Sequence, residues 1–186
     1  MFPNANALLS SSQEPYRLAV LRRLLILNST EQRVRDDMTR LLACSLEIPV
    51  YIISVLDDQC DRFKPSVGLP IRQSAEETSF CNVFFASQED IVVVEDTTQD
   101  ARFALHPFVT GPPFLRFYAA ARLIVAGHTV GTLCVRDEKP RKISMLQIQQ
   151  MQTLANAVAE LLNQRAVSNA AANVLSCDLR LLSAQL

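Results

Sequence analysis

The cysteine thiols are the side chains of this chain best suited to covalent chemistry. Cys81 stands out because it lies between Phe80 and Asn82 on a predicted short helix, and a helix N-terminus favours the thiolate. Glu76 and Glu77 precede it, and their negative charge opposes that effect. Redox chemistry or covalent ligand attachment at Cys81 therefore competes with a simpler role as a small, buried packing residue.

The sulfur and imidazole groups form no recognisable metal or disulfide pattern. The chain has five cysteines and two histidines, and it contains no CxxC pair. An odd cysteine count at irregular spacing argues against a disulfide framework. Structural zinc sites need four clustered ligands. We expect neither a metal nor disulfides, and we expect both histidines to lie on the surface. These residues are Cys44, Cys60, Cys81, Cys134, Cys177, His106 and His128.

Polar side chains follow the predicted strands in the middle of the chain. Asp96 and Thr97 come directly after a buried apolar strand, where exposed N–H groups can hold an anion or the polar head of a ligand. An ordinary capping turn is the alternative. Arg102 and Arg116 can each bind a carboxylate or phosphate through the planar guanidinium. Arg102 can instead pair with Asp96 or Asp100, so a structural role remains open beside the ligand role.

Aromatic side chains are suited to line a cup beside these polar groups. Phe80, Phe103, Phe117 and Tyr118 can wall a planar ligand, because ligand pockets are mainly apolar. Alternatively, they fill the core between sheet and helices. Cys134 alternates with its apolar neighbours along a strand, so it should face away from them, either lining the cup or lying in the plain core. The residues identify no ligand or cofactor. The candidate ligand site comprises Phe80, Cys81, Asp96, Thr97, Arg102, Phe103, Arg116, Tyr118 and Cys134.

The surrounding pattern predicts an α+β fold. Apolar residues at helical spacing predict helices over 14–28, 30–46 and 76–85, and a helical segment from Ser144 onward, unbroken or interrupted near 169–173. Runs of β-branched and aromatic residues predict strands over 50–56, 62–67, 91–94, 114–125 and 129–137. Strands joined by tight turns, such as the one at Gly127, pair antiparallel, and helices at both chain ends can cover one face of the sheet.

Bulk composition narrows the class of protein. The 186 residues carry a formal net charge of -1, so no broad attraction to nucleic acid or anionic membranes is expected. No apolar run approaches the length that spans a bilayer, about 20 residues. The first residues lack the basic start and apolar core of a signal peptide. We therefore expect a cytoplasmic protein that binds neither nucleic acid nor membrane.

Several short segments, in this order and spacing, resemble the GAF sensor domains of bacterial signalling proteins. The resemblance covers roughly residues 14–165 and implies an antiparallel sheet of about five or six strands, with the N- and C-terminal helices on one face and short helices and loops on the other. We expect a flexible N-terminus over 1–13, the GAF-like domain over 14–165 and a helical extension over 166–186. The matching segments are Arg17–Leu27, Ser54–Asp57, Arg62–Leu69, Thr78–Cys81, Val94–Phe103, Phe114–Ala121 and Gly131–Asp137.

The chain departs from the family pattern at positions near the cup. Val83 stands where the pattern commonly has His, and Arg62 where it has an aromatic residue. Ala101 replaces a Pro, while Ala120 and Arg122 replace the Gly and the Pro of a strand segment. These departures alter the pocket more than the core. Either the ligand differs from that of related domains, or the pocket has lost its ligand.

The resemblance implies a non-catalytic module that senses a small molecule, forms a homodimer through its terminal helices and regulates a signalling partner, in trans or attached. No catalytic triad, phosphate-binding glycine loop or carboxylate pair is present in the sequence. One alternative is a thiol-dependent reductase resembling the GAF-fold free methionine sulfoxide reductases, with Cys60 and Cys81 as its thiol pair. Another is an interaction scaffold with a collapsed pocket.

Overall fold

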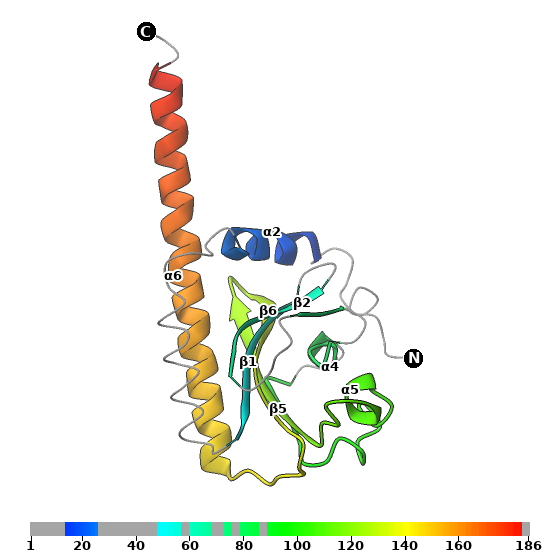
Figure 1. The fold of residues 1–186 in the computed structure, drawn as a ribbon. Helices are drawn as coiled ribbons and strands as arrows, with labels where there is room; N and C mark the ends of the chain where they lie inside the picture. The colour runs from blue at the N-terminus through cyan, green and yellow to red at the C-terminus, as the bar shows by residue number, and fades with distance from the viewer. Residues whose placement is uncertain are drawn as a thin grey trace.

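The described part of the chain folds into one antiparallel sheet with helices on both faces (Figure 1). The computed structural model describes residues 14–25, 48–56, 60–67, 73–75, 79–85 and 89–183. Its sheet has six strands in the order β3-β2-β1-β6-β5-β4. The elements are α2 (Glu14–Leu25), β1 (Val50–Leu56), β2 (Cys60–Val67), β3 (Gln73–Ala75), α4 (Asn82–Phe85), β4 (Ile91–Val94), α5 (Pro107–Thr110), β5 (Phe117–Val125), β6 (His128–Asp137) and α6 (Met145–Ser183).

Strand register places alternate side chains on opposite faces of the sheet. In β6, which pairs with both β1 and β5, Cys134 lies opposite Ile52 on one side and Ala120 on the other. These residues belong to the core beneath the short helices. The preceding residue of β6, Leu133, belongs to the core beneath the terminal helices. Because the side-chain period of a strand is two, this register fixes both faces at once.

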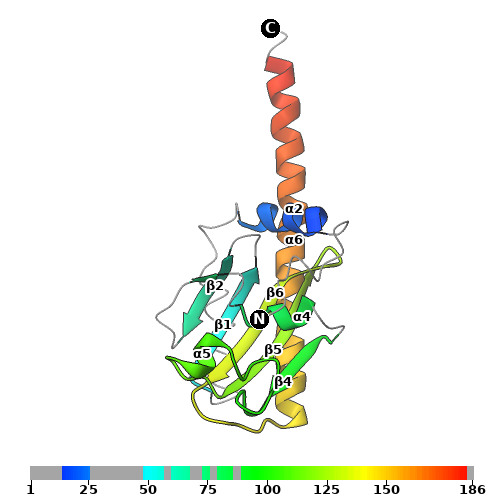
Figure 2. The same cartoon turned by 90° about the vertical axis from the view of Figure 1, so that its right-hand side faces the viewer.

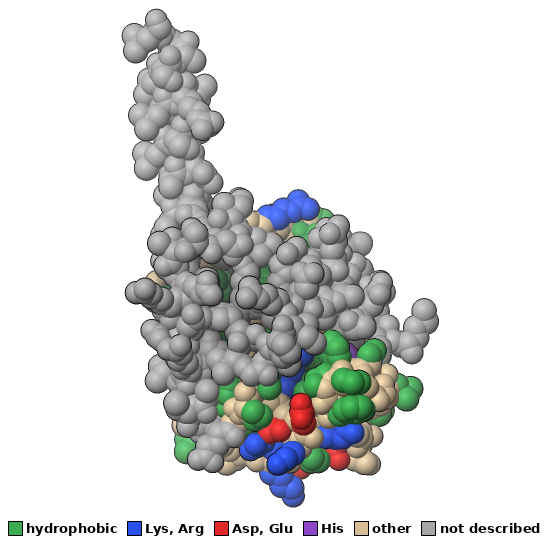
Figure 3. Space-filling model, in the orientation of Figure 1, with side chains coloured by type: hydrophobic (Ala, Val, Ile, Leu, Met, Phe, Trp, Pro, Cys, Tyr) green, Lys and Arg blue, Asp and Glu red, His purple; other side chains and the backbone are tan. Residues whose placement is uncertain are grey.

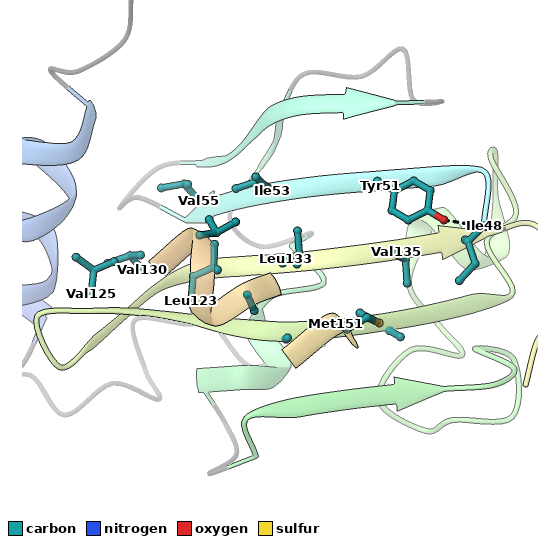
Figure 4. Packing of buried hydrophobic residues seen from close by; sticks show 14 of the residues in the cluster. Ile48, Tyr51, Ile53, Val55, Leu123, Val125, Val130, Leu133, Val135 and Met151 are labelled. Carbon is teal, nitrogen blue, oxygen red and sulfur yellow. Dashed lines mark hydrogen bonds between the residues drawn. The ribbon is translucent and has the colours of Figure 1, made fainter. Parts of the chain in front are cut away.

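The terminal helices cover one face of the sheet. Figure 4 shows this core, in which Met151 of α6 lies over Leu133 and Val135 of β6. Leu21 of α2 joins the same core, and α2 also contacts α6. The hydroxyl of Tyr51 accepts a hydrogen bond from the backbone N–H of Ile48 at 2.8 Å.

The opposite face carries α4, α5 and their loops, as the rotated view shows (Figure 2). Phe80, Phe84, Phe103 and Val109 pack there against the inner side chains of the central strands. On the surface of this region Leu105 and Phe114 are 79% and 49% exposed. Figure 3 shows hydrophobic side chains gathered there beside charged ones.

The predicted α+β architecture is confirmed, with both terminal helices on one face of the sheet. The C-terminal segment is a single helix, α6, which crosses the predicted domain boundary at 165–166 without a break. Its first turn is closed by a reciprocal pair of hydrogen bonds: the backbone N–H of Gln147 donates to the Ser144 hydroxyl, and that of Ser144 donates to the Gln147 side chain. The predicted helix over 30–46 lies outside the described residues.

The strands of the structure differ from the predicted ones chiefly in one boundary and in one additional strand. The strand expected from Phe114 begins at Phe117, because Phe114 has a φ of 57°, which an extended strand does not allow. The short strand β3 was not predicted. The predicted hairpin turn is confirmed, with φ of 50° at Ala126 and 78° at Gly127. Of the described helices, none is long and apolar enough to cross a membrane.

Candidate functional site

Four buried rings form a connected aromatic cluster on the face of the sheet opposite α6. Phe80 lies at its centre, with ring centroids 5.0 Å from Phe103, 4.9 Å from Tyr118 and 4.1 Å from His106. Phe103 and Tyr118 also contact each other, at 5.4 Å. Three of these residues come from the predicted site, so the structure does bring its aromatic members together. These three residues belong to the core on this face, whereas Phe117, the fourth aromatic residue expected at the cup, belongs to the core beneath the terminal helices.

His106 corrects one of the sequence-based predictions. It was expected on the surface, but it is only 1% exposed and lies against Phe80. The reason is local: His106 caps the N-terminus of α5, and its Nδ1 accepts a hydrogen bond from the backbone N–H of Phe108 at 3.0 Å. The helix-initiating Pro107 follows it directly, which is the signal that could have located this cap. His128 is half-buried at the start of β6.

Arg136 is a residue of this face that sequence reasoning missed. Its side chain is among the largest that are fully buried, at 1% exposure. The guanidinium carbon lies 4.8 Å from the centroid of Phe80 and 5.8 Å from that of Tyr118, within the range of a cation–π interaction. The strand alternation that places Cys134 on this face also places Arg136 there, two residues further on, and could have identified it.

Cys81 lies in a buried polar cluster formed with two hydroxyl side chains of the sheet. Its sulfur is 3.0 Å from the Ser54 hydroxyl and 3.1 Å from the Thr132 hydroxyl. The residue is 0% exposed, and its backbone N–H donates a hydrogen bond to the Ser79 hydroxyl. These contacts link the start of α4 to β1 and β6. Cys134 is also buried, and it faces the side of the sheet opposite to Leu133 and Val135, as predicted.

Asp96, Thr97 and Arg116 build a turn beside the aromatic cluster. The Asp96 carboxylate accepts hydrogen bonds from the Thr98 hydroxyl at 2.7 Å and from its backbone N–H at 3.0 Å, and these bonds lower the Asp96 pKa. The Thr97 hydroxyl donates to the Leu115 carbonyl at 2.7 Å. Arg116 donates to the same carbonyl. These contacts fit the capping-turn interpretation.

Arg102 lies on the surface above the cluster. Its side chain is 43% exposed and pairs with Asp100 at 2.6 Å, one of the two partners expected from the sequence. It also stands over the Phe103 ring at 5.6 Å. A guanidinium held in this way can still meet solvent. An external anion could therefore reach Arg102 without opening the core.

Arg122, a departure from the family pattern, has a structural explanation. Its guanidinium donates to the Phe84 carbonyl at 3.0 Å and to the Glu89 carbonyl at 2.8 Å. A third bond reaches the Thr129 hydroxyl at 3.1 Å. Arg122 thereby ties the end of α4 and the segment before β4 to the sheet. This bracing depends on the five-donor guanidinium, which a Pro at this position lacks.

The Asp100–Arg102 pair gives a prediction about pH. Hydrogen bonding from Arg102 holds the Asp100 pKa below its ordinary value. We expect Arg102→Gln to raise the Asp100 pKa towards the ordinary value of about 3.9. Because the folded-state pKa is depressed, the stability from this pair is present above the unfolded pKa and is lost as pH falls through the folded pKa. Carboxyl-carbon NMR titration from pH 2 to 6 measures the change.

Asp96 serves as the internal control in the same titration. Its pKa is lowered chiefly by Thr98, so Arg102→Gln should leave it in place, whereas Thr98→Ala should raise it and leave Asp100 unchanged. Equal shifts of both carboxyl groups in the Arg102→Gln protein would contradict the assignment of each group to its own partner.

No group of three or more His, Cys, Asp or Glu side chains that could hold a metal ion occurs in the described part of the chain. The candidate site consists of the aromatic cluster, the buried thiol and the turn at Asp96. Its chemistry is that of a binding or packing surface: aromatic faces, a buried guanidinium and bound hydroxyls.

The sequence and the fold of the chain match one family of domains. The sequence model described as "GAF domain" matches residues 22–162, and the chain belongs to this family. A curated relative is the protein named cyclic di-GMP phosphodiesterase PA2567 of Pseudomonas aeruginosa, 36% identical over 129 residues. The match covers 69% of this chain and 22% of the relative, so the chain spans about a fifth of that protein's length.

Solved structures, among them two GAF domains, share the fold at low sequence identity. The GAF domain of Thermosynechococcus elongatus PixJ superposes with a TM-score of 0.64 at 16% identity, covering 86% of this chain and 96% of that one. The GAF domain of the Acinetobacter phosphoenolpyruvate-protein phosphotransferase gives 0.59 at 20% identity, with 88% and 97% coverage. The type II free methionine-R-sulfoxide reductase of Thermoplasma acidophilum gives 0.58 at 14%, with 72% and 93%.

Proposed function

We propose that this GAF domain is a non-catalytic sensory and regulatory module that forms a homodimer through α2 and α6 and transmits a signal along α6. The observation that carries the proposal is the shape of α6, an unbroken helix of 39 residues. Residues from Met151 to Leu162 pack against the sheet. The helix then continues over 163–183, for about 30 Å at 1.5 Å per residue. Figure 1 shows this part standing clear of the sheet.

A second copy of the chain is the partner that best suits this helix. Isolated helices are marginal in water, and most of their stability in proteins comes from packing an apolar face. In the sequence, Val174, Leu175, Leu179 and Leu182 follow one another at helical spacing. Two such helices side by side, related by a two-fold axis, would bury these residues in a helical seam. The contact of α2 with α6 would connect that seam to the domain.

The regulated output is proposed from the similar proteins. The relative from Pseudomonas aeruginosa is named for cyclic di-GMP phosphodiesterase activity, and this chain matches only part of it. We therefore propose that the domain acts on an enzyme of cyclic-dinucleotide signalling, either attached or in trans. Under this proposal, changes in helix packing at the dimer seam alter the output. The nine residues predicted to bind a ligand remain the proposed sensory site.

A closed scaffold is the second candidate function, and the aromatic cluster favours it. The rings of Phe103, Tyr118 and His106 all contact Phe80, and all four residues are buried. A ligand would have to separate them. Native mass spectrometry of freshly purified protein distinguishes the candidates. Extra mass of a bound small molecule supports sensing, whereas bare protein after incubation with cell extract supports the scaffold.

The dimer is tested by light scattering coupled to gel filtration of the full chain. We expect a mass twice that of the 20.7 kDa chain. The double variant Leu175→Glu, Leu179→Glu should shift the protein to monomer, because it places charge in the proposed seam. Asn156→Glu is the matched control, since Asn156 is an exposed residue of the same helix. A monomeric wild-type chain, or a dimer that survives the double substitution, would refute the proposed interface.

A further inference from the structure

The face of the sheet beneath α4 and α5 contains a buried cation held against aromatic rings. We infer that Phe80 and Tyr118 form a binding site for a planar guanidinium cation, which we call the guanidinium box, and that Arg136 is its resident, tethered occupant. The box would accept a small monoalkylguanidinium compound only when the Arg136 side chain is absent or displaced. This inference rests on the contacts of Arg136 and not on the proposed signalling role.

The two rings form a corner that suits a flat cation. Their centroids lie 4.9 Å apart with the planes tilted by 55°. The guanidinium carbon of Arg136 lies 4.8 Å from one centroid and 5.8 Å from the other, so it contacts both rings at once. The electron-rich faces of the rings attract a cation, and desolvation strengthens that attraction. Arg136 is 1% exposed, so its attraction operates largely out of water.

The corner is held in place from several sides. Tyr118 lies in β5, directly opposite Arg136 in the register of β6. Phe80 approaches from the segment before α4, and the Tyr118 hydroxyl donates to its carbonyl at 3.5 Å. Phe103 stacks on Phe80 at 5.0 Å, with the planes only 17° apart. The ring of His106 lies against Phe80 as well. The rings are therefore fixed by packing, which preorganises the corner for its cation.

Other arginines over aromatic rings in the described residues differ from Arg136. Arg102 stands over Phe103 at 5.6 Å, but its side chain is 43% exposed and pairs with Asp100. Arg122 stands over Phe84 at the same distance, but it binds backbone carbonyls. The shortest of these cation-to-ring distances and the deepest burial thus both belong to Arg136. A guanidinium tethered to the sheet also competes with free cations at a high effective concentration.

The test is rescue of a cavity variant by a small cation that replaces the missing group. Arg136→Ala should lower the Tm by about 5–10 °C. Ethylguanidinium at millimolar concentration, with ionic strength matched by NaCl, should restore about half of that loss. Ethylammonium and ethylurea, which lack the planar shape or the charge, should restore less. Wild-type protein and the matched control Arg102→Ala should show no such shift. Equal shifts for Arg136→Ala and Arg102→Ala would overturn the inference.

A measurement on the wild-type chain covers the case in which Arg136→Ala does not fold. Ring currents should move the assigned side-chain proton resonances of Arg136 upfield, well away from those of the exposed Arg102 in the same NMR spectrum. Arg136 resonances at the positions typical of exposed arginines would overturn the inference without any substitution.

Discussion

Replacing Gly131 with alanine is expected to lower the free energy of unfolding by about 3 kcal/mol, at the upper end of the usual cost of overpacking. A Cβ at this position would lie 1.9 Å from the carbonyl oxygen of Ser54 and 3.0 Å from the Cα of Val55. Both atoms belong to the backbone of β1, which is paired with β6 on one side and β2 on the other. Neither β1 nor β6 can move away without disturbing the strand paired on its other side. Urea unfolding followed by circular dichroism measures the loss.

Gly127 provides the control for that experiment. It lies in the hairpin turn with a φ of 78°, and a Cβ there would meet no atom within 4 Å. Gly127→Ala should therefore cost only the backbone penalty of the left-handed conformation, about 1–2 kcal/mol. A Gly131→Ala protein as stable as Gly127→Ala or more so would show that β1 and β6 can separate more easily than their close approach implies.

The second large effect is expected at Phe80. Phe80→Ala should destabilise the domain by about 3–5 kcal/mol, the usual range for a buried Phe. The substitution removes the ring that contacts Phe103, Tyr118 and His106, and it leaves Arg136 with one aromatic face fewer. Chemical unfolding again provides the measurement. Phe80→Leu should cost clearly less, because it retains most of the buried apolar volume.

Phe114→Ala is the matched aromatic control. Phe114 is half-exposed and lies in the loop before β5, so its loss should change stability by less than about 1 kcal/mol. If both Phe-to-Ala variants lost similar stability, the central position of Phe80 in the cluster would be disproved.

Local patterns were sufficient to predict most of the architecture. The unbroken apolar run of β4 and the glycine turn between β5 and β6 were readable because adjacent residues determine them. Alternation along β6 correctly gave the direction of Cys134. The same rule applied two residues further would have revealed Arg136. The residue type points the other way, because a charged residue near a strand end is usually solvated.

The parts of the site that could not be predicted depend on contacts between distant segments. His106 is buried because α5 folds back over Phe80, a partner 26 positions away. Arg122 braces Phe84, which lies 38 positions earlier in the chain. Neither contact produces a periodic pattern in the sequence from which it could be predicted. By contrast, Arg102 and Asp100 are only two positions apart, and their pairing was one of the two predicted from the sequence.

The alternation of β6 has a mechanical consequence. The strand separates the two cores of the domain. Cys134 and Arg136 face the aromatic side. Leu133 and Val135 face the other side, which Met151 and Ala155 of α6 cover. A rotation of the strand about its own axis moves both sets of side chains together. A shift of the β6 backbone would therefore move Arg136 against its rings and Leu133 and Val135 against α6 at the same time, without a hinge or loop between them.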